Sequence, residues 1–368
     1  KFGLETVVKQ EVQALGFEEV VVSDGRIQFN ATLADIPKAN LWLRCADRVL
    51  LKISEFQAHT FDDLFEQTKA LPWETWITPD GRFTVNAKSV KSVLKSGRSC
   101  QSIVKKAVVE RLKTAYQLDW FPETGAAFTI RLALVRNTAL LTIDTSGTGL
   151  HRRGYRAQAG EAPLKETFAA GLVKLTQWQP GQRLLDPMCG SGTVLIEAAM
   201  IGRNMAPGLN REFAAEGWPI IPAEAWQTAR QEAKKAQLPS GKLQLFGSDI
   251  DSASIALARS NAQKAGVGDD IVFTPKDVKK LWIDQQFGVV ITNPPYGIRM
   301  AEYRNLNGIY IAFNKTFRKK LGWAVNVLTA DEKFPDYFKR SRPDKVRKLY
   351  NGTIKTNYYQ WNGRKSPP

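Results

Sequence analysis

The feature that most constrains this chain is an alternation of apolar strands and helices that starts near Gln182 and fills the C-terminal half. Strands are expected where short apolar runs end in turn residues, and helices where apolar residues recur about every 3.6 positions. The expected strands are 183–188, 242–250, 271–278, 287–297 and 323–330, and the expected helices are 193–202, 252–266 and 309–319. This alternation predicts a doubly wound α/β sheet that binds ligands beyond the carboxyl ends of its strands.

A glycine-rich stretch, DPMCGSGT at Asp186–Thr193, lies where the first of these strands ends. Gly190, Ser191 and Gly192 let the backbone turn tightly into the next helix and leave room for a ligand at the helix N-terminus. The stretch matches neither the P-loop nor the G-x-G-x-x-G dinucleotide pattern. It is typical of a loop that binds a nucleotide-type ligand, and an ordinary tight turn between strand and helix is the alternative.

Acidic residues mark the ends of the next two strands. Asp249 and Asp251 occur in GSDID, and Asp277 occurs in PKDV. An acid at such a place can accept hydrogen bonds from ribose hydroxyls, and Asp249 is the better candidate for that role. Asp277 is placed to accept a bond from an adenine amino group. Each acid alone would be explained as a helix cap, but one acid per successive strand favours a nucleoside site.

The fourth strand ends in TNPPYG, at Thr292–Gly297. Two prolines fix the backbone there, so that a carbonyl and the Asn293 amide can point at one amino group while Tyr296 offers an aromatic face to a base. Two acceptors would favour the localised, tetrahedral nitrogen of an exocyclic amine as it attacks a methyl group. A rigid turn without chemistry is the alternative.

The N-terminal half reads as small α+β units. A helix with apolar residues at Leu4, Val8 and Val12 precedes two strands joined at Asp24-Gly25. A helix at 34–43, strands at 49–53 and 82–87, a helix at 99–116 and two strands joined around Asn137 are expected to follow.

These motifs make the chain resemble the class I S-adenosylmethionine-dependent methyltransferases of the N/D-P-P-Y type, because DPMCGSGT, SDID, KDV and NPPYG occur in that family's order. Over nearly its whole length the chain is similar to bacterial THUMP-domain RNA methyltransferases, above all those that make N2-methylguanine in large-subunit (23S) ribosomal RNA. The longer blocks that carry the resemblance are IDTSGTGLHRRGYR, APLKETFAA, DPMCGSGTVLIEAAM, APGLNR and NPPYGIRM.

The resemblance implies three parts and a direct methyl transfer. The parts are a ferredoxin-like module (1–43), a THUMP domain that grips RNA (44–156) and a Rossmann-like methyltransferase domain with a seven-stranded sheet (157–368). S-adenosylmethionine would be held by Lys165, Glu166, Thr167, Asp186, Pro187, Cys189, Gly190, Gly192, Asp249, Ile250, Asp277 and Val278. The catalytic residues would be Asn293, Pro294, Pro295 and Tyr296, with the Asn293 side chain and the Pro294 carbonyl on the guanine N2 amine and Tyr296 stacked on a flipped base. Cys189 is interpreted as a packed residue and not as a nucleophile.

The charge of the chain favours a polyanionic partner. Fifty-two Lys and Arg stand against 36 Asp and Glu, a net charge of +16, and basic proteins gain affinity for nucleic acid by releasing its counterions. Candidate phosphate contacts are Lys88, Lys91, Lys95, Arg98, Arg152, Arg153 and Arg156. The alternative for each of them is a solvated cation.

Other classes of site and location are disfavoured. The three cysteines, Cys45, Cys100 and Cys189, are far apart, which argues against a disulfide framework and for a reducing cytoplasm. With two histidines and no ligand cluster, no metal is expected. No membrane span is expected either. A monomer is favoured, and because the sequence begins at Lys1, the natural N-terminus is expected to lie upstream.

Alternative functions remain open at this point. The same residues could methylate N2 of guanine in transfer RNA or N6 of adenine in DNA, because the Asn-Pro-Pro-Tyr block suits both amines. A catalytically silent RNA-binding assembly factor is a third alternative.

Overall fold

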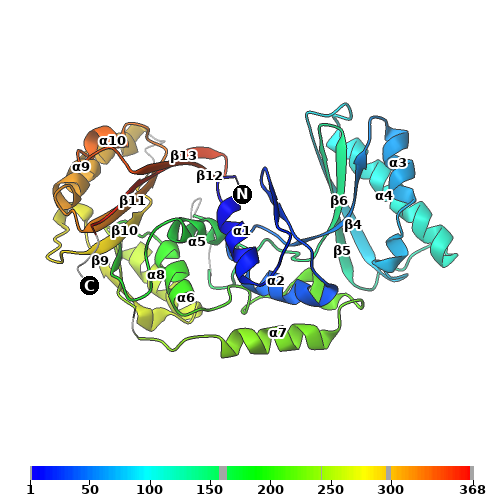
Figure 1. The fold of residues 1–368 in the computed structure, drawn as a ribbon, viewed down its shortest axis with the longest axis horizontal. Helices are drawn as coiled ribbons and strands as arrows, with labels where there is room; N and C mark the ends of the chain where they lie inside the picture. Colours follow the sequence, from blue (N-terminus) through cyan, green and yellow to red (C-terminus); the bar gives the residue numbers. More distant parts are fainter. Residues whose placement is uncertain (1, 157–163, 242, 296–299, 365–368) are drawn as a thin grey trace.

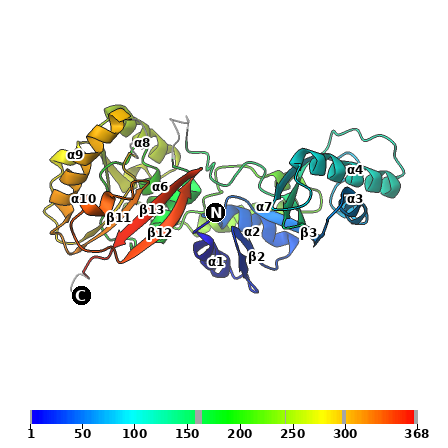
Figure 2. The same cartoon turned by 90° about the horizontal axis from the view of Figure 1, so that it is seen from above.

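Three units lie in a row in the computed structural model, which describes residues 2–156, 164–241, 243–295 and 300–364. A seven-stranded sheet with its helices occupies one end, a small N-terminal module lies in the middle, and a four-stranded sheet with two helices occupies the other end (Figures 1 and 2). The boundaries expected at 43/44 and 156/157 stay predictions.

The large sheet has the strand order β12-β13-β11-β10-β7-β8-β9. The strands are β7 (Leu184–Asp186), β8 (Leu245–Asp249), β9 (Ile271–Pro275), β10 (Gly288–Thr292), β11 (Trp323–Thr329), β12 (Lys345–Asn351) and β13 (Ile354–Trp361). All pairs from β11 to β9 are parallel, and β13 runs antiparallel to both of its neighbours. The predicted seven-stranded α/β sheet is therefore confirmed.

The hairpin β12–β13 is the part of this sheet that the sequence interpretation missed. Its two strands turn at Gly352, which has a φ of +64°. The Asn351-Gly352 pair is a recognised hairpin signal, since glycine adopts positive φ without a steric penalty. That signal was present in the sequence.

Helices cover both faces of the large sheet. On one face lie α5 (Glu166–Lys174), α6 (Thr193–Gly202) and α8 (Ser252–Lys264), and on the other lie α9 (Met300–Phe317) and α10 (Phe334–Tyr337). Along β10, Val289 and Ile291 belong to the first core and Val290 to the second, because successive side chains of a strand point to opposite faces. Helix α7 (Ala223–Lys235), which was not expected, reaches under the N-terminal module and packs against α2 (Ile36–Trp42) of that module (Figure 1).

The four-stranded sheet has the order β3-β6-β5-β4. It consists of β3 (Leu50–Gln57), β4 (Arg82–Val90), β5 (Ala127–Val135) and β6 (Thr138–Asp144), with α3 (Phe61–Lys69) and α4 (Gly97–Tyr116) packed on one face. Helix α4 buries Val104, Val108 and Leu112. The strands and the helix expected in this region are confirmed.

The N-terminal module contains α1 (Glu5–Ala14), β1 (Val21–Ser23), β2 (Arg26–Gln28) and α2 (Ile36–Trp42). Its two short strands turn at Asp24-Gly25, as predicted, and Gly25 has a φ of +70°. They form a two-stranded sheet of their own.

A buried group of charged side chains joins two segments to the large sheet. They are the N-terminal module and the connector, the stretch between β6 and α5, which is described from 145 to 156 and from 164 to 165. Glu197 on α6 is fully buried, and its carboxylate lies 3.5 Å from Arg44 Nη1 and 3.4 Å from Arg153 Nε. The Tyr155 hydroxyl donates to the same carboxylate at 3.3 Å. Arg153 also donates to the carbonyls of Arg44 and Leu150. One carboxylate thus ties together segments that are more than 40 residues apart.

Removing the charge of Glu197 is expected to destabilise the protein strongly. Glu197→Gln keeps the side-chain volume but removes the carboxylate with which two buried guanidinium groups pair, which costs about 3–5 kcal/mol of unfolding free energy. Chemical unfolding followed by tryptophan fluorescence would measure it.

The matched control is Glu332→Gln, which breaks the exposed Lys355–Glu332 pair. Exposed pairs contribute about 0–1 kcal/mol. Equal losses in the two variants would show that the Glu197 group does not hold the units together.

Candidate active site at four strand ends

The sheet order brings the predicted motifs together. Strands β10, β7, β8 and β9 are consecutive neighbours and parallel, so their carboxyl ends lie along one edge. Asp186 ends β7, Asp249 ends β8, Asp277 follows β9 and Asn293 follows β10. Residues spread over more than 100 positions therefore meet at one edge of the sheet.

The glycine loop between β7 and α6 uses its two glycines differently. Gly192 has a φ of +79°, and a Cβ there would lie 2.8 Å from the Phe273 ring and 3.0 Å from Ala258, so packing excludes a side chain. Gly190 has a φ of +51°, and a Cβ there would meet nothing within 4 Å. Open space beside Gly190, at the start of α6, is where a ligand could approach the backbone.

Asp186 is held beside the Asn-Pro-Pro motif. Its Oδ1 accepts a hydrogen bond from Thr292 Oγ1 at 2.8 Å and one from the Met188 amide at 3.2 Å. Burial raises the pKa of the Asp186 carboxyl to about 7, against the lowering effect of these bonds. Thr292 was not among the predicted site residues, and its place directly before Asn293 was the signal that could have found it.

The three acids at the ends of β8 and β9 all accept hydrogen bonds from backbone amides. Asp249 accepts from the Gly190 amide at 2.9 Å and from the Asp251 amide at 3.0 Å, which ties the end of β8 to the glycine loop. Asp251 caps α8 by accepting from two amides of its first turn, so a helix cap explains it. Asp277 accepts from the Lys279 amide at 2.9 Å.

Hydrophobic neighbours of these acids differ in exposure. Ile250 is 72% exposed at the open edge, whereas Val278 is buried. An apolar side chain as exposed as Ile250, next to a carboxylate, suits contact with the flat face of a base.

Pro187 and Cys189 are packed inside the loop. Burial raises the pKa of the Cys189 thiol, so the thiolate needed for nucleophilic attack is disfavoured. The Cys189 amide donates to the Ser248 carbonyl at 2.9 Å. The structure agrees with the interpretation of Cys189 as a packed residue.

The three residues of the block Lys165–Thr167 differ in burial. Lys165 is exposed, whereas Glu166 and Thr167 are buried at the start of α5. The Thr167 hydroxyl donates to Asp47 at 3.4 Å and so faces the N-terminal units. Glu166 lies 3.5 Å from Arg156 Nη1, and burial raises the pKa of its carboxyl.

Two of the predicted phosphate contacts are turned inward. The prediction is wrong for Arg153, which is buried, whereas for the partly buried Arg156 it stays a prediction. Arg153 is 3% exposed and is bound to Glu197. Arg156 donates to Thr193 Oγ1 at 2.8 Å, at the first residue of α6, and pairs with Glu166. A charge pattern in a connector cannot distinguish a solvated arginine from one that a buried acid from another segment neutralises.

The remaining predicted phosphate contacts are exposed. Lys88, Lys91, Lys95 and Arg98 lie at one end of β4 and the start of α4, and Arg152 lies on the connector. The Val93 amide donates to Asn137 Oδ1 at 2.7 Å, which holds the 91–96 loop on the β5–β6 turn. These five cations are accessible to a phosphate backbone.

The Asn-Pro-Pro motif follows β10. Asn293 is half-buried, Pro294 is buried and Pro295 is exposed. Tyr296 lies outside the described residues. Asn261 is a further supporting residue that the sequence interpretation missed: its amide donates to the Ser191 carbonyl at 3.2 Å from α8.

In the described ranges no group of three His, Cys, Asp or Glu side chains could hold a metal ion. No helix among them is long and apolar enough to cross a membrane.

Family models account for most of the chain. Residues 153–360 match the model described as "RMKL-like, methyltransferase domain", residues 1–50 match an "RlmL ferredoxin-like domain", and residues 58–144 match a THUMP domain. The chain belongs to the RMKL-like methyltransferase family. The ferredoxin-like, THUMP and methyltransferase assignments made from the sequence are confirmed.

Two curated relatives of this methyltransferase are similar over nearly all of the chain. One is "Putative RNA methyltransferase YpsC" of Bacillus subtilis (strain 168), 46% identical over 99% of this chain and 95% of that protein. The other is "Ribosomal RNA large subunit methyltransferase K/L" of Psychromonas ingrahamii, 36% identical over 96% of this chain. The chain spans about half, 48%, of that second relative.

Solved structures agree with the fold. A protein from Listeria monocytogenes, named a predicted N6-adenine-specific DNA methylase, is 45% identical with a TM-score of 0.93 and is matched over 99% of this chain and 94% of its own. The methyltransferase SMU.472, whose structure contains S-adenosylhomocysteine (SAH), is 39% identical with a TM-score of 0.93, over 100% and 97% of the two chains.

The residues present fit S-adenosylmethionine, the cofactor of this methyltransferase family. The loop leaves open space at Gly190, and Asp249 and Asp277 end adjacent strands. Among the described side chains, Glu166 Oε2 and Arg156 Nε are buried without a hydrogen-bond partner beside the start of α6. Unsatisfied buried groups of both charges near a glycine loop are what an amino-acid end of a ligand would satisfy.

The stability of the cofactor-free protein is expected to depend on Asp186. Its carboxyl has a pKa near 7 in the folded protein and about 3.9 in an unfolded chain. Between about pH 4 and pH 7 the Asp186 carboxyl is protonated in the folded protein but ionised in the unfolded chain. The free energy of unfolding therefore falls as the pH rises through this range. Asp186→Asn keeps an acceptor for Thr292 and Met188 and removes the charge. The variant should be more stable than the parent at pH 8, by up to about 4 kcal/mol, with the difference vanishing near pH 4.

Thermal unfolding from pH 4 to 8 checks this. Asp284→Asn, at an exposed acid, is the control and should show no such pH-dependent gain. A difference between Asp186→Asn and the parent that does not change with pH would contradict the assignment.

Proposed function

We propose that this methyltransferase transfers the methyl group of S-adenosylmethionine to the exocyclic N2 amine of a guanine in 23S ribosomal RNA. The observation that carries the proposal is the contact between Thr292 and Asp186, which places the Asn-Pro-Pro motif directly beside the cofactor loop. The resemblance to N2-guanine enzymes and the name of the Psychromonas relative support the RNA and the base.

The chain's own residues are proposed to bind and orient the two reactants. Asp249 would accept from the ribose hydroxyls, Asp277 from the adenine amine, and Gly190 would leave room for the methionine end. S-adenosylmethionine, when bound, supplies a methyl group on a positively charged sulfur. Because the lone pair of a guanine amine is delocalised into the ring, acceptors that favour the tetrahedral nitrogen raise its reactivity.

Asn293 and the Pro294 carbonyl are proposed to be those acceptors, with Tyr296 stacked on the flipped base. Pro294 is buried and follows β10 closely, and this restraint on the backbone supports the proposed role of its carbonyl. The amine proton is proposed to pass to water after transfer.

The basic end of the four-stranded unit is proposed to hold the RNA. Lys88, Lys91, Lys95 and Arg98 are exposed there, and Arg152 is exposed between the units. Contacts of this kind position RNA without reading its sequence. Three free, buried cysteines agree with a reducing compartment such as the cytoplasm.

Adenine in DNA is the second candidate, favoured by the name of the Listeria protein. The match to a THUMP domain favours RNA, since that domain makes up a whole unit of the chain, residues 58–144.

The product and the role of Asn293 can be tested together. The protein should transfer labelled methyl groups to 23S RNA and yield N2-methylguanosine, identified by mass spectrometry of nucleosides. Asn293→Ala should lower kcat by about 100-fold or more, because it removes an acceptor that acts in the transition state. Its affinities for cofactor and RNA should change little.

Transfer RNA and DNA are run in parallel. N2-methylguanosine in transfer RNA would show that the substrate is transfer RNA and not 23S RNA. Methyladenine would show that the base is misassigned. Full activity of Asn293→Ala would disprove the role of that residue. Cofactor binding without any transfer would favour the assembly-factor alternative.

The basic end is tested by the salt dependence of RNA binding. The double variant Lys95→Ala/Arg98→Ala should bind RNA more weakly and lower the slope of log K against log salt by about 2, one for each phosphate that the two side chains neutralise. Filter binding from about 50 to 300 mM salt, the range over which counterion release changes affinity strongly, measures it.

The matched control, Lys234→Ala/Lys235→Ala, removes the same charge from the exposed face of α7. An equal effect of the control would mean that only net charge matters.

A further inference from the structure

The hairpin β12–β13 extends past the edge of the large sheet at which the candidate site lies. Thr292, the last residue of β10, pairs with Val327 of β11, and Val327 pairs with Tyr359 of β13. Because β13 runs antiparallel to β11, the residues before Tyr359 continue beyond that level. Lys355 stands four residues beyond it, about 13 Å at the rise of a strand. Since β13 is the second strand from β10, the hairpin forms a wall beside the site.

One face of this hairpin is buried and holds it in place. Leu349 and Tyr358 belong to the core on the α5 side of the sheet, and the Tyr358 hydroxyl donates to the Leu172 carbonyl at 3.2 Å. Gly3, at the start of the chain, packs against Leu349. In both views the hairpin, drawn in red, lies next to the N-terminus (Figures 1 and 2). The wall is therefore supported from behind.

The other face of the hairpin is exposed near its turn. Tyr350 lies directly opposite Lys355. Lys348 shares this face with Tyr350, because side chains two positions apart on a strand point the same way. Tyr350 is 43% exposed, and both lysines are exposed. An accessible aromatic ring with a cation on either side is thus held at the open end of the wall.

The charge of this face suits a phosphate backbone. Among the residues that the structure describes, no carboxylate pairs with Lys348, whereas Lys355 pairs with the exposed Glu332 at 3.1 Å. Water and salt screen an exposed pair of this kind, so a phosphate can replace the carboxylate. A basic surface that carries an aromatic ring for stacking is how proteins bind single-stranded nucleic acid.

We propose that Tyr350 stacks on a base of the RNA strand that carries the target guanine, and that Lys348 contacts a phosphate of the same strand. This inference rests on the proposed function and adds a positioning residue to it. A guanine that is flipped out at Asn293 loses its stacking, and the unpaired bases near it lose theirs too. Tyr350 replaces that stacking for one of them. Because an aromatic ring accepts any base, the hairpin fixes the path of the strand and not its sequence.

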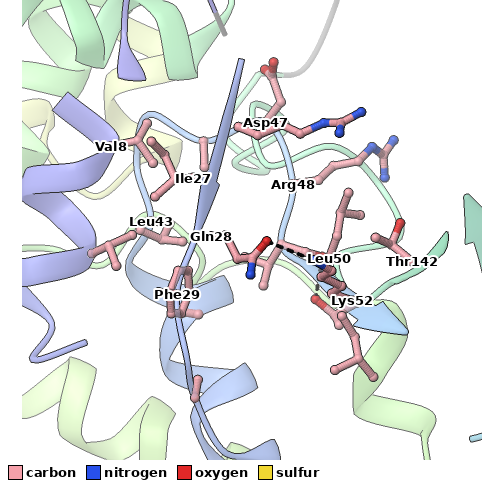
Figure 3. A pocket seen from close by; sticks show the side chains of 18 of the residues that line it. Val8, Ile27, Gln28, Phe29, Leu43, Asp47, Arg48, Leu50, Lys52 and Thr142 are labelled. Carbon is pink, nitrogen blue, oxygen red and sulfur yellow. Dashed lines mark hydrogen bonds between the residues drawn. The ribbon is translucent and has the colours of Figure 1, made fainter. Parts of the chain in front are cut away.

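The large cavity between the N-terminal module and the four-stranded sheet is a poorer place for this strand. Its volume is about 1060 Å³, and Figure 3 shows the apolar side chains of Val8 and Ile27 in its lining. Arg48 and Arg131 also line it, but both pair with the buried Asp144. Its arginines are therefore already neutralised, whereas Lys348 on the hairpin is not.

Two substitutions of Tyr350 test the stacking. With S-adenosylhomocysteine present, Tyr350→Ala should bind 23S RNA about 5-fold or more weakly in filter binding, because it loses the ring. Tyr350→Phe keeps the ring and should bind as the parent does. In methyl transfer, Tyr350→Ala should raise KM for RNA by the same factor and leave kcat unchanged, since the stacking is made before and during the reaction alike. The melting temperature should not change, because the side chain is exposed.

Matched controls separate this face from its surroundings. Lys348→Ala should lower the slope of log K against log salt by about 1, whereas Lys345→Ala, at an exposed lysine on the opposite face of β12, should leave it. Trp282→Ala removes a ring that is 81% exposed in the segment before β10, and it should leave RNA affinity unchanged.

Several results would overturn the inference. They are parental RNA affinity in Tyr350→Ala, an equal loss in Tyr350→Phe or Trp282→Ala, and a loss of affinity for DNA without one for RNA. Because binding is measured without methyl transfer, the two proposals can fail separately. Weaker RNA binding by Tyr350→Ala without any N2-methylguanosine from the parent would disprove the proposed function alone. N2-methylguanosine made by Tyr350→Ala at the parental KM would disprove this inference alone.

Discussion

The arrangement of the three units depends on one buried carboxylate. Glu197 projects from α6, the helix that begins at the glycine loop, and it pairs with Arg44 from the end of the N-terminal module and with Arg153 from the connector. Burying an arginine without a counter-charge costs folding free energy. These two segments are therefore most stable where their arginines meet Glu197. Because Arg156, three residues further on, binds Thr193 at the start of the same helix, the connector is fixed at two points of α6. The THUMP unit is thereby positioned relative to the glycine loop.

The chemistry depends on strand order. Parallel strands deliver their carboxyl ends to one edge, and the placement of β10 next to β7 brings Asn293 beside the glycine loop although the two lie far apart in sequence. The Thr292–Asp186 hydrogen bond then fixes the two motifs to each other. On the other side of β7, Asp249 accepts from the Gly190 amide, so the loop is held from both neighbours. Such a site is preorganised by backbone and packing, which is what an electrostatic mechanism needs.

The sequence interpretation failed where a residue's partner comes from another segment. Arg153 and Arg156 stand in a basic connector beside Arg152, and nothing local separates the exposed arginine from the two that are turned inward. The buried acids that neutralise them, Glu197 and Glu166, lie on helices of the other unit. The hairpin β12–β13 differs from these arginines, since its Asn-Gly turn is a local signal that is present in the sequence itself.

By itself the sequence determined the α/β fold class and the four motifs, because alternation, glycines and strand-end acids are local patterns with strong physical preferences. The seven strands were implied by the family resemblance alone. It also determined which residue types are present for the chemistry. Only the tertiary structure decided which motifs meet, which glycine is required by packing and which borders open space, and which arginines face solvent. Those depend on strand order and on burial against distant segments. Neither is encoded in any one stretch of the chain, since each is a property of contacts that form only when the whole chain is folded.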